Sequence, residues 1–383
     1  MKLEGLPMVT RSCALVEQLQ AIPDPRRQCR NLKHRLVDVL LIGFCGVLAD
    51  CDDFMEIADW ADDHEDFLRT FLELPNGIPS HDTLRRVFAA VRPAALQGIL
   101  IPWLQQRRGL PGEWVHIDGK ALRGSRCPAR DLGALHLVSA WASQQGLTLG
   151  QVAVDAKSNE ITAIPLLLDL LDLRDKVVTI DAAGCQKEIA AHIVAGGGDY
   201  VLAVKDNQPT LHAEVGQAFE TALEKDDPRL RRHATEETGH GRHERRVVWV
   251  LPAGRHVSGR AAWVGLCTLV LVLREVTCQV SGAQTVEVQY YISSLRPSAR
   301  RLAGAIRGHW GIENGLHWVL DVVFREDARR LYDRTAAENV GLLNRLATSL
   351  LRGDPAKGSL KRKRKRAGWN TDYLAQLLGI PSP

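Results

Sequence analysis

Several common signatures are missing from this sequence of 383 residues. It has eight cysteines but no Cys-x-x-Cys pair, and a chain of this length needs no disulfide framework, so we expect reduced thiols. No apolar run approaches the length of a membrane span, and the N-terminus lacks a basic, apolar and small-residue leader, which predicts a soluble cytoplasmic protein. The sequence also lacks a phosphate-cradling glycine loop, a nucleophile elbow and a zinc-ligand cluster, which argues against the enzyme classes that depend on them.

The charge is nearly balanced, but its distribution is uneven. The formal net charge is only +4 at pH 7, so the total identifies no partner. Residues 361–366 are all basic and form either a phosphate-binding arm or a solvated tail. We favour the arm, because each neutralised phosphate steepens the salt dependence of DNA binding. Its candidate DNA contacts are Lys361, Arg362, Lys363 and Arg364.

Apolar periodicity divides the chain into five segments. We expect a helical N-terminal domain (1–107), the first part of an α/β core (108–206), a β-rich insertion (207–294), the second part of the core (295–351) and a basic tail (352–383). In the first segment Ser80 is a candidate N-cap for a helix that carries Arg85 and Arg86. These arginines either touch DNA or form a solvated basic edge, and we favour the edge.

The sequence of the predicted α/β core indicates one mixed sheet. Strand-like runs occupy 114–118, 135–141, 147–155, 177–180 and 200–204, and helical runs occupy 160–173 and 185–194. Three strands in a meander, followed by strand-helix-strand crossovers, predict helices on both faces of the sheet. This is the order of the ribonuclease H-like fold, in which the first and fourth strands lie side by side and parallel. Asp118 and Asp181 would then be neighbours.

A helix predicted over 298–325 carries a third acid, Glu313. Four side chains at i, i+4 spacing share one face of it: His309, Glu313, His317 and Asp321. A second stripe consists of Gly308, Gly311 and Gly315. Each glycine costs a helix interior roughly 1 kcal/mol relative to alanine, so the stripe indicates the close approach of another backbone or close packing of the helix on the sheet.

The three acids Asp118, Asp181 and Glu313 supply hard oxygen ligands, which suit Mg²⁺ or Mn²⁺ better than zinc. A pair of such ions activates a water or a 3′-hydroxyl on one side of a phosphodiester and stabilises the leaving oxygen on the other. The sequence therefore predicts a metal-dependent acidic site that cuts and joins DNA.

Long, ordered motifs resemble a known family. Residues 117–124 (IDGKALRG) resemble the first-aspartate motif of DDE insertion-sequence transposases, and most closely that of the H-repeat-associated (ISAs-type) branch. Residues 155–161 (DAKSNEI) and 179–187 (TIDAAGCQK) resemble the next two motifs of that branch. Further matches are 200–208, 240–246 (HGRHERR), 290–295 (YYISSL) and 309–314 (HWGIEN), and residues 79–83 (PSHDT) resemble its associated N-terminal domain.

The resemblance implies a ribonuclease H-like catalytic core with Asp118, Asp181 and Glu313 as the triad, a β-rich insertion before the glutamate, and a divalent metal. One departure concerns the tyrosine-arginine-glutamate-lysine signature of the wider group. Ile306, His309 and Leu320 stand at the tyrosine, arginine and lysine positions. The contacts inferred for that group are therefore not transferred, although His309 stays a candidate DNA contact.

Other polar residues have two interpretations each. Lys205, Asn207 and Gln208 either hold a phosphate outside the strand end or form a polar loop. Lys120 and Arg123, just past Asp118, are candidate contacts of the DNA backbone. Asp155 and Glu160 are auxiliary acids or, as we favour, caps of the next helix together with Ser158. In the insertion, Arg242 and Arg245 could grip DNA together with His240, His243 and Arg246; a zinc site at the two histidines is discounted because no cysteine pair is near.

We thus expect a transposase that binds double-stranded DNA at the ends of its own element, associated with the nucleoid and acting as a homodimer because two ends must be paired. The alternatives are a transposase relic that binds DNA without catalysis and a structure-specific nuclease of related fold. Strand cleavage in Mg²⁺ that survives Asp181→Asn would contradict the transposase. DNA binding without metal-dependent nicking would favour the relic, and cleavage without strand joining would favour the nuclease.

Overall fold

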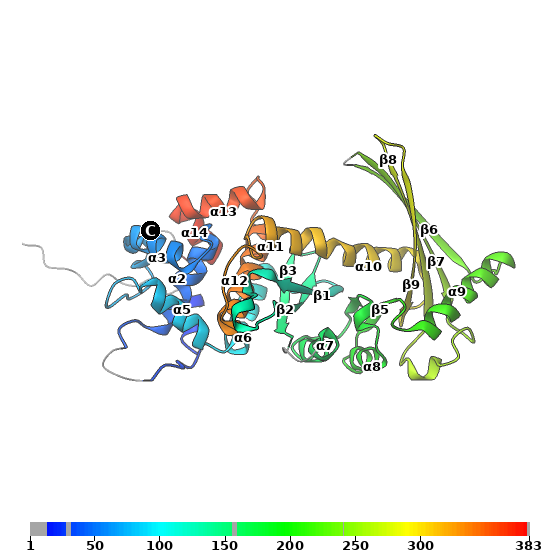
Figure 1. Ribbon diagram of the computed structural model, residues 1–383, viewed down its shortest axis with the longest axis horizontal. Coiled ribbons are helices and arrows are strands. Elements are labelled where there is room, and N and C mark those ends of the chain that lie inside the picture. Colours follow the sequence, from blue (N-terminus) through cyan, green and yellow to red (C-terminus); the bar gives the residue numbers. More distant parts are fainter. Residues whose placement is uncertain (1–13, 28–31, 155–158, 240, 381–383) are drawn as a thin grey trace, which may run out of the picture.

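The computed structural model describes residues 14–27, 32–154, 159–239 and 241–380. Figure 1 shows the N-terminal helices at one end, a sheet through the middle and the curved strands β6 to β9 at the other end. Helix α10 crosses from these strands towards the N-terminal helices.

Within the described residues, one sheet of nine strands has the order β3-β2-β1-β4-β5-β9-β8-β7-β6. The first strand, β1 (Trp114–Leu122), pairs antiparallel with β2 (Leu135–Ala142) and parallel with β4 (Val177–Ile180). The outer strands of this part are β3 (Leu147–Ala153), antiparallel to β2, and β5 (Asp199–Val204), parallel to β4. The predicted ribonuclease H-like order is confirmed, including the parallel contact of the first and fourth strands.

The segment after β5 extends the same sheet. Its strands are β6 (Arg231–Gly239), β7 (Arg242–Pro252), β8 (Thr268–Cys278) and β9 (Gln284–Ser293), and β9 pairs antiparallel with β5. The insertion is therefore continuous with the core sheet through this pairing. A 3₁₀ turn (Arg260–Ala262) precedes β8.

Helices cover both faces of the core strands. Helices α7 (Glu160–Leu168) and α8 (Lys187–Ala195) share an apolar core with Val115, Ile117, Val178 and Ile180. The long helix α10 (Ala299–Ile312) packs on the other face, where its Leu302 and Ile306 meet Val177, Val201 and strands β7 to β9. Because successive side chains of a strand alternate between faces, His116 and Asp118 lie on the α10 side of β1.

The predicted helix over 298–325 is interrupted at Glu313. A π-helical segment (Glu313–His317) follows α10, and α11 (Trp318–Val322) completes the run. The glycine stripe divides accordingly. A Cβ at position 308 would lie 2.7 Å from the His116 ring, so Gly308 permits close helix-sheet packing, whereas nothing lies within 4 Å of a Cβ at position 311. π-Helical insertions of this kind occur frequently at functional sites.

The N-terminal part is helical, as predicted. Its helices are α1 (Ala14–Leu19), α2 (Leu36–Leu48), α3 (Phe54–Asp63), α4 (Glu65–Leu68), α5 (His81–Ala90) and α6 (Pro93–Arg108). The predicted cap is confirmed, because the Ser80 side chain accepts from the Thr83 amide. Arg85 and Arg86 both pair with Asp82 on the exposed face of α5, which agrees with the favoured solvated edge. Helix α12 (Arg334–Gly353) contacts α2, α5 and α6 as well as β2 and β3, and so joins the helical part to the sheet.

None of the described helices is by itself long and apolar enough to span a membrane, although the bent pair α5 and α6 passes that test on length and composition alone. The remaining helix, α9 (Pro209–Glu224), links β5 to β6 and packs on β9.

The C-terminal basic segment is folded. Residues 361–366 lie within α13 (Leu360–Trp369), which packs against α14 (Thr371–Leu378) and α2. Arg364 is fully buried and Lys363 is 7% exposed. The prediction of Lys363 and Arg364 as DNA contacts was wrong, because the charges of both side chains are used inside the protein: the Lys363 ammonium donates to two backbone carbonyls and Arg364 pairs with Asp50.

Candidate active site

Asp118 and Asp181 meet where the parallel contact of β1 and β4 ends. The last paired residues are Ile117 and Ile180, and each aspartate follows directly. The strand is longer than the predicted run of 114–118, because β1 continues to Leu122 on the side of β2. The two carboxylates therefore lie at the carboxyl end of β4, the edge at which α/β sheets place their ligands.

The electrostatics of this pair are unfavourable without a cation. Burial, together with the negative charges of Asp181, Glu160 and Glu313, raises the pKa of Asp118 to about 7. Burial and the Glu160 charge also raise the pKa of Asp181, which nearby Lys205 partly opposes. Like charges held in a partly buried site disfavour their own ionisation, and a divalent cation would relieve this repulsion.

Glu313 reaches the site from the opposite layer. It is exposed at the start of the π-helical segment, and its charge acts on Asp118. One turn later, Nδ1 of His317 lies 3.5 Å from Oδ2 of Asp118. Burial lowers the pKa of His317 to about 3, so a neutral imidazole stands beside Asp118. The helix thereby brings Glu313 close enough for its charge to act on Asp118.

A line of hydrogen bonds fastens α10 to the sheet beneath the acids. Oγ1 of Thr179 lies 2.7 Å from Nδ1 of His116 and 2.9 Å from Nδ1 of His309, and Nε2 of His116 lies 2.7 Å from Oγ of Ser143. Burial lowers the pKa of His309 to about 4. The prediction of His309 as a DNA contact was therefore wrong, because its neutral ring is bonded to the sheet.

Lys120 also has a structural role, in place of the predicted contact with the DNA backbone. Its side chain is 7% exposed, and its ammonium lies 2.6 Å from Asp321 and 3.2 Å from Asp327. These pairs tie β1 to the segment after Glu313, which leaves no charge for a phosphate. Arg123 differs, because its side chain is 81% exposed while its backbone amide donates to Asp327; it remains a candidate DNA contact.

The loop after β5 supports the turn that follows Asp181. The Asn207 amide donates to the Ala182 carbonyl at 2.6 Å, and the Gln208 amide donates to the Cys185 carbonyl at 2.9 Å. Both side chains thus hold the shape of this turn, in agreement with the polar-loop interpretation. Lys205 is exposed and stays a candidate phosphate contact.

The candidate contacts on β7 divide in the same way. Arg242 is exposed, whereas Arg245 pairs with Glu275 at 2.8 Å and Glu236 at 3.5 Å across the strands. Arg246 is 7% exposed and stacks on Trp310 of α10, with 5.6 Å between its Cζ and the ring centroid. His240 and Asp155 lie outside the described residues.

Glu160 is a further acid at the site, and the favoured capping role was wrong. Helix α7 is capped by Asn159, whose side chain accepts from the Ile161 amide at 3.1 Å. The Glu160 carboxylate instead lies 2.9 Å from Nε2 of His136, and its charge acts on both aspartates. Its charge effect on the aspartates favours the alternative interpretation of Glu160 as an auxiliary acid.

The carboxylates of this site are suitable ligands for a hard divalent cation, although they are not arranged to coordinate one as they stand. Carboxylate oxygens are the ligands of Mg²⁺ and Mn²⁺, and the charge repulsion at Asp118 points the same way. Within the described ranges, no group of three His, Cys, Asp or Glu side chains is close enough to hold a metal as it stands. Closure would require the exposed Glu313 side chain to turn towards the aspartates.

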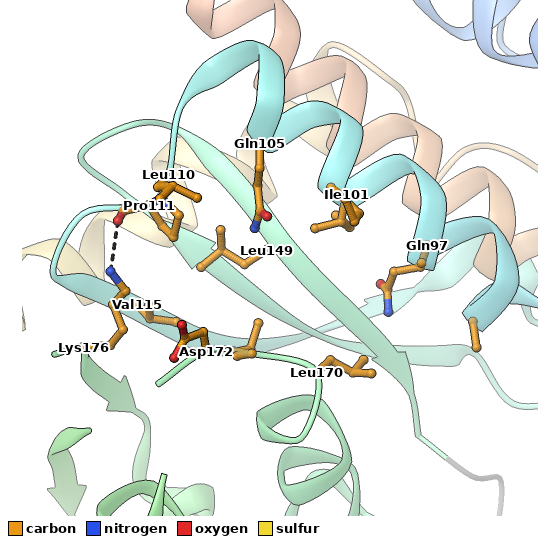
Figure 2. Close-up of a pocket in the computed structure, with 14 residues that line it drawn as sticks. Gln97, Ile101, Gln105, Leu110, Pro111, Val115, Leu149, Leu170, Asp172 and Lys176 are labelled. Atoms are coloured by element: carbon orange, nitrogen blue, oxygen red, sulfur yellow. Dashed lines mark hydrogen bonds between the residues drawn. The ribbon is translucent and has the colours of Figure 1, made fainter. Parts of the chain in front are cut away.

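A cavity of about 380 Å³ lies elsewhere, between α6 and the sheet (Figure 2). It is lined by Ile101, Leu110, Leu149 and Leu170 among others, and includes none of the candidate catalytic residues. The polar groups at its margin serve the fold. The Lys176 ammonium donates to the Pro111 carbonyl at 3.1 Å, as Figure 2 shows, and the Gln97 side chain accepts from the Gln151 amide.

Asp118→Asn is expected to stabilise the metal-free protein at pH 8 by about 2 kcal/mol, because it removes a buried charge and its repulsions. A carboxyl whose pKa is raised on folding to about 7 binds more protons in the folded state. Its contribution to stability therefore falls as the pH rises from its ordinary pKa of 3.8 towards 7. Urea unfolding in EDTA at pH 8 and pH 4 checks this; an equal gain at both pH values would show that charge is not the cause.

The chain is similar to known proteins over most of its length. The family described as "Transposase DDE domain" matches residues 113–350, and the family described as "DDE_Tnp_1-associated" matches residues 16–104. "Putative transposase YncI" of Escherichia coli O157:H7 is 40% identical over 372 residues, covering 95% of this chain and 94% of that protein. "H repeat-associated putative transposase YhhI" of Escherichia coli strain K12 is 37% identical over 369 residues, covering 95% and 97%. The chain therefore belongs to the DDE transposase family.

Proposed function

We propose that this protein binds the ends of its own DNA element, cleaves the phosphodiester bonds there and joins the freed ends to a target. The observation that carries the proposal is the meeting of Asp118 and Asp181 at the end of the β1–β4 contact, with the charge of Glu313 acting on Asp118. An acid pair of this kind is poorly suited to a purely structural role, because its members raise the cost of each other's charge.

The catalytic work of the chain is placement. Asp118, Asp181 and Glu313 would hold two Mg²⁺ or Mn²⁺ ions, which when bound activate a water or 3′-hydroxyl and stabilise the leaving oxygen. The neutral His317 beside Asp118 orients that carboxylate without competing for it as a cation. Lys120 fixes the segment after Glu313 to β1, so the glutamate is positioned relative to the aspartates.

DNA would approach along the exposed basic side chains around this site. Arg123 follows β1, Lys205 stands near Asp181, and Arg242 lies on β7. Lys361 and Arg362 on the exposed side of α13 would add contacts at the helical end. Such contacts position the backbone and carry no sequence information. Two copies are needed to pair two ends, which places a homodimer on the DNA, within the nucleoid of the cytoplasm.

The test uses the full chain and DNA from the flanks of its encoding gene, with Mg²⁺, Mn²⁺ or EDTA. Cleavage at the element ends and joining to target DNA, both lost in EDTA, is the expected result. Cleavage without joining would instead favour a structure-specific nuclease. Binding with no cleavage in either metal would identify a DNA-binding relic and overturn the proposal.

A further inference from the structure

Glu160 is placed to do more than begin a helix. Since Asn159 already provides the cap of α7, the Glu160 carboxylate is not needed at the helix terminus. It extends instead to β1, where a Cβ at position 119 would lie 2.0 Å from its Oε1. Gly119 therefore leaves a slot for the Glu160 carboxylate, because any side chain at position 119 would displace that carboxylate.

This slot lies on the face of β1 opposite to Glu313. Residue 119 points to the α7 side and residue 118 to the α10 side, since side chains alternate along a strand. Glu160 thus approaches the end of the β1–β4 contact from one layer of helices, and Glu313 approaches from the other. The two aspartates lie between them, and the charge of Glu160 acts on both.

His136 explains how this carboxylate is held. It lies on β2, opposite Ala121 of β1, and its Nε2 is 2.9 Å from Oε1 of Glu160. His136 therefore engages one carboxylate oxygen and leaves the second to other partners. A histidine in this position orients a carboxylate in the way that groups hydrogen-bonded to metal ligands orient those ligands.

We propose that Glu160 is a fourth carboxylate ligand of the divalent-cation site, held in place by His136 and admitted by Gly119. The inference rests on the proposed function, because it assumes that Asp118, Asp181 and Glu313 bind the cation. It adds an acid from the α7 layer to a site otherwise built from β1, β4 and α10.

The test is Mn²⁺ binding to the full chain without DNA, measured by calorimetry and by the rise in unfolding temperature that Mn²⁺ produces. Glu160→Gln keeps the size of the side chain and is expected to weaken Mn²⁺ binding about tenfold, within the range found for changes around metal sites. The matched control is Glu188→Gln, which changes an exposed glutamate in the first turn of the neighbouring α8 and is expected to leave the affinity unchanged. Unfolding temperatures in EDTA show whether each variant is folded.

Two outcomes would overturn the assignment. One is an unchanged Mn²⁺ affinity in Glu160→Gln. The other is a larger loss of Mn²⁺ affinity in His136→Gln than in Glu160→Gln, which would mean that the cation depends on the histidine rather than on the glutamate. A wild-type chain that binds no Mn²⁺ would overturn both this inference and the metal chemistry of the proposed function. If wild type binds Mn²⁺ and cleaves DNA while Glu160→Gln binds it equally well, only the inference fails.

Discussion

Glu313→Gln is expected to lower Mg²⁺-dependent cleavage of end DNA by about 10³-fold while DNA binding persists. Bound metal ions stabilise the charge of the transition state by several kcal/mol, and each 1.36 kcal/mol corresponds to a factor of ten in rate. Because Glu313 is exposed, the Glu313→Gln variant should fold like the wild-type protein. Single-turnover cleavage measures the rate, and a filter-binding titration on the same DNA measures the affinity.

The matched control for this substitution is again Glu188→Gln, an exposed glutamate away from the triad, which should cleave at the wild-type rate. Asp181→Asn should lose cleavage as Glu313→Gln does, since both acids belong to one site. Normal cleavage by either variant would contradict the assignment of the triad. Loss of DNA binding together with cleavage would instead assign Glu313 to DNA recognition.

The core of the fold could be predicted because apolar pattern and strand order constrain each other. The strands that begin at Trp114, Leu135, Leu147, Val177 and Asp199 all have mainly buried runs, and few topologies accommodate such a series. Strand β6 could not be found in this way. Every residue from Arg231 to Gly239 except His233 is exposed, so its conformation comes from pairing with β7 rather than from its own composition.

The site residues divide on a similar physical basis. The meeting of Asp118 and Asp181 was predictable, because both residues directly follow the paired part of a buried strand. The roles of the basic side chains were not predictable. A lysine or arginine can contact DNA or pair inside the protein, and only the tertiary contacts decide between the two. Lys120 and Arg123 are three residues apart in one motif, yet Lys120 is buried between two aspartates and Arg123 is exposed. The break at Glu313 likewise has no signal in the i, i+4 pattern.

Arg364→Ala is expected to lower the free energy of unfolding by about 3–5 kcal/mol, the usual cost of removing one partner from a buried ion pair. The guanidinium is fully buried and lies 2.9 Å from Asp50. It also donates to the backbone carbonyls of Val47, Cys51 and Val323 and stacks on Phe324. Alanine would leave the carboxylate and these carbonyls without their donor, in the seam between α13, α2 and the segment after Glu313. Urea unfolding measures the loss.

Arg362→Ala is the matched control, because it removes the same side chain from an exposed position of α13. Surface changes usually alter stability by no more than about 0.5 kcal/mol, so its unfolding should resemble that of wild type. The two variants should also differ in the opposite sense on DNA, where only Arg362→Ala should reduce the salt slope of binding, by about one phosphate contact. A stable Arg364→Ala variant with reduced DNA affinity would contradict the buried position and restore the phosphate-binding arm. In the folded helix, by contrast, two of the six basic residues, Lys363 and Arg364, use their charge to join the C-terminal helices to the rest of the chain.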